Sequence, residues 1–126
     1  MSKPDTNRER KTLKSKRPVA GMRARATIVA AIKNKEVLRF IYNDEERAVE
    51  PQTYGISTAG HEVLRARQVG GDSRSGSSGF AKLFDVEKMS DLKTTGTRFE
   101  KALAEHNPED TAMVKVFVSL PRPNKH

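Results

Sequence analysis

The chain has 126 residues, with 24 Lys or Arg against 16 Asp or Glu and a formal net charge of +8. Only 35% of its residues are apolar and 32% are charged, so we expect one small domain and a part of the chain that does not pack. Cysteine is absent, which excludes disulfides and thiol catalysis, and no apolar run is long enough for a signal peptide or a membrane span, so we expect a soluble cytoplasmic protein.

Residues 1–20 are predicted to form a basic arm. Leu13 and Val19 are their only large apolar side chains after Met1, too few to offset the entropy of ordering the segment, so we expect it to be disordered when free. Clustered cations gain free energy by displacing counterions from nucleic-acid phosphates, which favours backbone binding over a role in solubility alone. The residues predicted to contact the backbone are Arg8, Arg10, Lys11, Lys14, Lys16 and Arg17.

After the arm, the spacing predicts a short amphipathic helix over 22–34, in which Ile28, Ala31 and Ile32 share one face. Alternating apolar residues between polar turns then predict a series of short strands. These strands cover 37–42, 47–51 (ended by Pro51), 61–69, 80–88 and 92–95, with a Gly/Ser loop at 70–79, a short helix at 98–105 and a last strand at 112–120.

This order predicts a mainly β (α+β) fold. We expect a small barrel of about five strands, with a short helix before it and a helix-strand extension after it. The predicted domain spans 21–120, and 121–126 are expected to form a disordered tail.

Several short motifs follow one another along the chain. They are Ala31-Ile32, the strand with Leu38, Phe40 and Tyr42, the R-x-V-E-P run from Arg47 to Pro51, Tyr54-Gly55, Gly60 with Leu64 and Ala66, Phe84 to Leu92, and Thr95 to Phe99. With this set in this order, the segment from Ile28 to Phe99 resembles the WYL domain of bacterial regulators and phage-defence proteins. The Trp and Tyr of the motif that names the family are replaced by Glu62 and Val63.

The resemblance implies an Sm-like or SH3-like barrel whose basic face binds a negatively charged ligand, either a nucleotide or single-stranded nucleic acid. Many relatives carry a helix-turn-helix ahead of this domain, which twenty residues cannot hold, so a protein partner that supplies a DNA-binding domain is a hypothesis. Relatives often dimerise, and the strand at 112–120 either completes the barrel or pairs with a second copy. A homodimer is therefore a further hypothesis.

Arg65 and Arg67 are the main candidates for the ligand-binding face. They alternate with Leu64 and Ala66, so they are predicted to project from the barrel wall, and guanidinium groups pair well with phosphate. The alternative is a solvated strand face. Other candidates are Lys82, Lys88 (alternatively a charged corner with Glu87), Arg39, and Tyr54 as a base-stacking residue.

No catalytic or cofactor site is predicted. His61, His106 and His126 are too scattered for a metal site, and the loop at 70–79 lacks a phosphate-binding P-loop pattern. We therefore expect a non-enzymatic module that binds nucleic acid or a nucleotide, in transcriptional regulation or phage defence. The alternative is a small-nucleotide sensor or a structural dimerisation module that acts through a protein partner.

Overall fold

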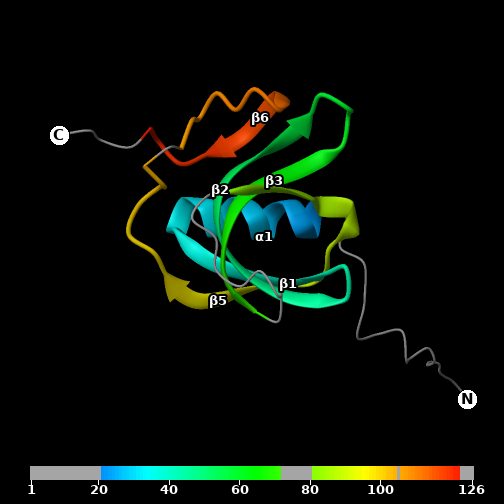
Figure 1. Cartoon of the computed structure of the whole chain (residues 1–126), viewed down its shortest axis with the longest axis vertical. Coiled ribbons are helices and arrows are strands. Elements are labelled where there is room, and N and C mark those ends of the chain that lie inside the picture. Colours follow the sequence, from blue (N-terminus) through cyan, green and yellow to red (C-terminus); the bar gives the residue numbers. More distant parts are fainter. Residues whose placement is uncertain (1–20, 72–80, 105, 123–126) are drawn as a thin grey trace, which may run out of the picture.

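The computed structural model describes residues 21–71, 81–104 and 106–122, and it consists of one helix packed on a strongly curved antiparallel sheet (Figure 1). The strands follow the order β4-β3-β2-β1-β5, and β6 pairs with β2 outside this order. The prediction of a mainly β, barrel-like fold with a preceding helix is confirmed. The elements are α1 (Gly21–Asn34), β1 (Glu36–Tyr42), β2 (Glu45–Ser57), β3 (Glu62–Gly71), β4 (Lys82–Asp85), the 3-10 helix η2 (Val86–Lys88), β5 (Ser90–Arg98) and β6 (Met113–Ser119).

Strand β2 connects the two parts of the sheet. Its first residues pair with β1, its last residues pair with β6, and β3 follows it along most of its length. The prediction that Pro51 ends this strand is wrong, because Pro51 lies inside β2. The β2–β3 register shifts between Pro51 and Thr53, and a proline, which has no N–H to donate, is tolerated at such an irregularity.

Local turn chemistry fixes the β1–β2 hairpin. Asn43 and Asp44 have φ angles of 53° and 62°, the left-handed conformation that both central residues of a type I′ turn require. Asn and Asp tolerate this conformation better than other side chains. The turn therefore sets the pairing of Tyr42 with Glu45 and of Leu38 with Val49.

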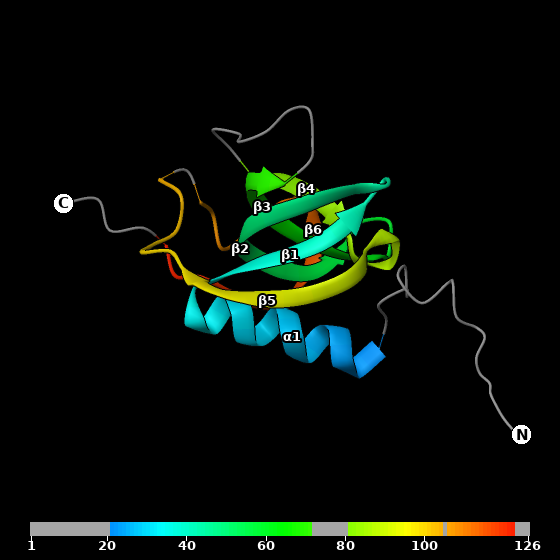
Figure 2. The ribbon, with the colours of Figure 1, turned by 90° about the horizontal axis from the view of Figure 1, so that it is seen from below.

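The helix covers one side of the sheet. Ala24, Ile28, Ala31 and Ile32 are all buried, as the helical spacing predicts, and Figure 2 shows α1 lying alongside β5 and β1. In the same core, three aromatic rings pack edge to face: Phe40 and Phe84 with centroids 5.3 Å apart, and Tyr42 and Phe84 at 5.1 Å. Each such pair contributes about 0.5–1.5 kcal/mol beyond the burial of its area.

Two predicted elements differ from the structure. The strand predicted over 80–88 is shorter, because Asp85 caps η2 by accepting a hydrogen bond from the Glu87 N–H at 3.0 Å. The helix predicted over 98–105 is wrong, because Arg98 ends β5 and 99–104 contain no helix. The Phe99 and Leu103 N–H groups bond to the Lys35 carbonyl and the Gln52 side chain instead, so tertiary contacts outweigh the helical spacing.

The predicted arm at 1–20, most of the loop at 70–79 and most of the tail at 121–126 lie outside the described residues. Within the part that is described, no helix has the length and apolarity to span a membrane.

The contact between β2 and β6 generates a prediction about stability. A Cβ at Gly55 would lie 2.1 Å from the Lys115 carbonyl oxygen, whereas one at Gly70 would lie 3.7 Å from the Ala48 Cβ. We expect Gly55→Ala to lower the free energy of unfolding by about 2 kcal/mol or more through overpacking, and Gly70→Ala to change it by less than about 0.5 kcal/mol. Urea unfolding of both variants measures the difference. Equal stability of the two would contradict the tight β2–β6 approach.

Candidate functional site

The residues predicted for a basic barrel face lie on different sides of the sheet. Arg65 and Arg67 project outward from β3, with 27% and 34% of their side chains exposed. Lys82 pairs with the buried Ala66 across the β3–β4 ladder, and cross-strand partners share a face, so Lys82 points to the opposite side from Arg65. Lys88 ends η2 and is exposed. The structure therefore brings Arg65 and Arg67 together, but not the four residues as one surface.

Arginines on β1, β2 and β3 form ion pairs with carboxylates. Arg39 lies 2.8 Å from Glu46, Arg47 lies 3.2 Å from Glu45, and Arg67 lies 3.8 Å from Glu50. These pairs are mostly half-exposed, and such pairs contribute little to stability. These pairs lower the attraction of the sheet for phosphate, because a paired guanidinium attracts phosphate less strongly than a free one. Arg39, a predicted ligand contact, is engaged in this way.

Tyr54 is fully buried, so the prediction that it stacks on a base is wrong. Its hydroxyl donates to the Glu62 carboxylate at 2.6 Å and accepts a long hydrogen bond of 3.4 Å from Arg25. Its ring packs on Phe117 with the centroids 5.1 Å apart. Burial, with the Glu62 hydrogen bond adding to it, raises the pKa of Tyr54 from 10.0 to about 12. Tyr54 therefore links α1, β2, β3 and β6 as a structural residue.

Arg65 is held by a carboxylate from far along the chain. Its Nε and Nη2 donate to the two oxygens of Asp110 at 2.8 and 3.1 Å, and the Asp110 side chain is only 9% exposed. The Ala112 N–H donates to the same carboxylate at 2.9 Å. The hydrogen bonds from Arg65, with that of Ala112, hold the pKa of Asp110 below its usual range against the opposing effect of burial.

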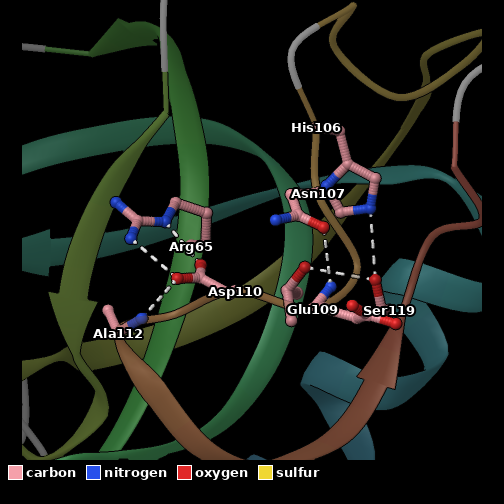
Figure 3. Close-up of polar contacts among 8 residues, drawn as sticks. Arg65, His106, Asn107, Glu109, Asp110, Ala112 and Ser119 are labelled. Carbon is pink, nitrogen blue, oxygen red and sulfur yellow. Dashed lines mark hydrogen bonds and ion pairs between the residues drawn. The ribbon is translucent and has the colours of Figure 1, made fainter.

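A polar pocket of about 250 Å³ lies beside this pair. Figure 3 shows Arg65 and Asp110 on one side, and His106 and Asn107 on the other. The volume matches a single small polar group or base better than a large ligand. The pocket is lined by Gln52, Arg65, Ala81, Leu103, His106, Asn107, Asp110 and Thr111.

Hydrogen bonds fix the orientation of the two side chains opposite Arg65. The Asn107 Oδ1 accepts from the Glu109 N–H at 3.0 Å, so its amide nitrogen turns toward Arg65 (Figure 3). The His106 Nε2 lies 2.8 Å from the Leu120 carbonyl oxygen and 3.1 Å from the Ser119 hydroxyl. Because a carbonyl only accepts, Nε2 carries a proton and Nδ1 is the nitrogen available to other groups.

Sequence reasoning found only Arg65 of this pocket. Gln52 lies beyond the point where the strand was expected to end, and Leu103 lies in the segment predicted to be a helix. Asn107 and Asp110 belong to the run Asn-Pro-Glu-Asp, whose composition is typical of a turn and does not indicate a binding site. No local pattern signals that Asp110 meets a strand 45 residues earlier.

No group of three or more His, Asp or Glu side chains close enough to hold a metal ion occurs in the part of the chain that the structure describes.

Comparison of the chain with protein-family models, with curated proteins and with solved structures finds no match.

The buried phenol generates a prediction about pH. The raised pKa means that the folded state favours the protonated Tyr54, so this stabilisation is complete below pH 10 and disappears as the pH rises through 12. We expect Tyr54→Phe to be less stable than the natural chain by about 1 kcal/mol at pH 8, because the hydrogen bond to Glu62 is removed. The gap should narrow above pH 10, as measured by urea unfolding at several pH values. A stability difference between the two proteins that stays constant up to pH 12 would contradict the raised pKa of Tyr54.

Proposed function

We propose that this protein is a non-enzymatic, cytoplasmic nucleic-acid-binding module, related to WYL domains, whose first twenty residues contact phosphates while the barrel presents a pocket beside Arg65. A helix followed by a curved, barrel-like sheet of six strands supports the relationship, since the resemblance implies a small barrel after the helix. The role belongs to transcriptional regulation or phage defence, with a protein partner supplying any DNA-reading helices.

The distribution of charge carries this proposal. Arg25, Arg39, Arg47, Arg65 and Arg67 each have a carboxylate within 2.8–3.8 Å. Residues 1–20 instead hold seven Lys or Arg and only two acidic residues. The described domain therefore offers a nearly neutral sheet, and the strongest source of phosphate affinity lies in the segment that precedes α1.

Binding across a salt series tests the proposal. In the full chain, Arg8, Arg10, Lys11, Lys14, Lys16 and Arg17 are replaced by Gln, and fluorescence anisotropy is measured with labelled single-stranded and duplex oligonucleotides. We expect the affinity of the natural chain to fall steeply with salt. For the variant, the slope of the logarithm of the binding constant against the logarithm of the salt concentration should be shallower. On single strands, the difference should be about 0.7 for each phosphate that the arm no longer neutralises.

A control variant separates the arm from charge in general. Lys33, Lys93 and Lys101 are exposed on the domain, and their replacement by Gln should leave most of the salt slope in place. The same slope in all three proteins, or no oligonucleotide binding at all, would refute the nucleic-acid proposal. Thermal stabilisation by a free nucleotide without oligonucleotide binding would select the small-nucleotide sensor instead.

A second candidate function, self-assembly, is favoured by β6. Val114 is 68% exposed and Val116 is 37% exposed, on a strand that pairs only with β2 among the described residues. Such an edge is prone to pair with another strand. The run Val-Lys-Val-Phe-Val can pair with itself. Antiparallel pairing centred on Val116 places Lys115 of one copy opposite Phe117 of the other. Within one chain, the Lys115 Nζ already lies 5.8 Å from the centroid of the Phe117 ring.

Light scattering tests this second candidate. We expect the natural chain to form a dimer at micromolar concentration. Val116→Lys should be a monomer, because position 116 lies at the centre of the pairing and the two lysines would lie opposite each other and repel. Thr94→Lys, at an exposed position of β5, is the matched control and should remain a dimer. A monomeric natural chain would rule out the pairing.

A further inference from the structure

We propose that the pocket beside Arg65 binds a phosphate group. In the absence of ligand, the Asp110 carboxylate occupies the phosphate's position on the Arg65 guanidinium, and the ligand displaces it. This inference rests on the proposed function and names the chemistry of its pocket. The phosphate belongs either to a free nucleotide or to a nucleic acid.

The first support is the set of donors that face the pocket. The Asn107 amide nitrogen is directed there because its Oδ1 is held by Glu109. The Thr111 side chain also lines the pocket, and a hydroxyl can donate to an oxyanion. Arg65 adds the Nε and Nη2 groups that donate to Asp110. Donor groups from three residues around a small volume suit a group made of acceptor oxygens.

The second support is the way in which Asp110 holds Arg65. A carboxylate and a phosphate both present two oxygens to the paired N–H groups of a guanidinium, so the same bidentate geometry serves either anion. The distances of 2.8 and 3.1 Å show this arrangement already formed. Asp110 therefore acts as an internal substitute for the ligand's oxygens.

The third support is the location of Asp110 in the chain. Residues 106–112 contain no helix or strand. Among the contacts of this carboxylate, one hydrogen bond comes from the neighbouring Ala112 N–H and the others come from Arg65. The Arg65 side chain is 27% exposed, so another anion can approach its guanidinium from the solvent. Releasing Asp110 requires a change in this segment but leaves the strand pairing intact.

Titration of the full chain with inorganic phosphate, followed by NMR of the backbone amides, tests the inference. We expect the amides of 106–112 and the Arg65 side-chain N–H to shift together. Asp110→Asn should tighten phosphate binding about two- to fivefold, because it removes the competing charge and keeps the oxygen that accepts from Ala112. Glu109→Gln removes the same charge one residue away from an exposed side chain and should have a smaller effect.

A second variant keeps the test valid if Asp110→Asn does not fold. Asn107→Asp retains the oxygen that accepts from Glu109 but turns an anionic oxygen toward the pocket in place of the amide nitrogen. Asn107 is exposed, so folding should be unaffected, and we expect phosphate binding to weaken at least about tenfold. Unchanged affinity in this variant would overturn the inference.

The source of the phosphate is distinguished by two further titrations, one with a nucleoside monophosphate and one with short oligonucleotides that carry or lack a 5′-phosphate. A response to either phosphorylated probe supports the site and identifies its source. No shift of the 106–112 amides with any probe, or equal tightening by Asp110→Asn and Glu109→Gln, would overturn it. Arm-dependent oligonucleotide binding is measured separately, so it can survive if this inference fails.

Discussion

The backbone hydrogen bonding of β2 is the constraint on which the rest of the molecule depends. One strand of 13 residues serves β1, β3 and β6, so it has to bend between its two halves. The irregularity near Pro51 allows this bend. Just beyond this irregularity, Gln52 lines the pocket and Tyr54 receives a hydrogen bond from Arg25 of α1.

Charge pairing is the second organising feature. On β1, β2 and β3, arginines and carboxylates occupy neighbouring positions, and their mutual attraction leaves little net field on the sheet. The domain therefore combines a high content of charge with a nearly neutral surface. Arg65 differs from the others because its partner, Asp110, comes from an irregular segment 45 residues away rather than from an adjacent strand. This difference is why one ion pair among several suggests a binding site.

Much of the fold is predictable from local patterns, and most of the pocket is not. The helical spacing of Ile28, Ala31 and Ile32 identifies α1 because one buried face suffices to define it. The alternation along 112–120 identifies β6, although Val114 and Val116 on that strand are exposed. The segment after β5 also has helical spacing, at Phe99, Ala102 and Leu103, yet its backbone bonds to Lys35 and Gln52. Tyr54 likewise has the residue type of a base-stacking group and the position of a core residue. Long-range contacts decide such cases, and no sequence window contains them.

The close approach of β6 to β2 has a consequence for how the protein is made. Thr53 and Ser119 are hydrogen-bonded across 66 positions of the chain, and Arg25 of α1 stacks on Phe117 at 4.5 Å. During synthesis, α1 and the hairpins of β1, β2 and β3 emerge long before β6 does. Until then, the edge of β2 near Gly55 has no partner strand and the helix lacks one of its contacts. Such an edge attracts other strands, so the newly made chain is exposed to aggregation over an interval set by the translation of 58–119. Slower translation of that stretch would prolong this exposure and lower the yield of folded protein.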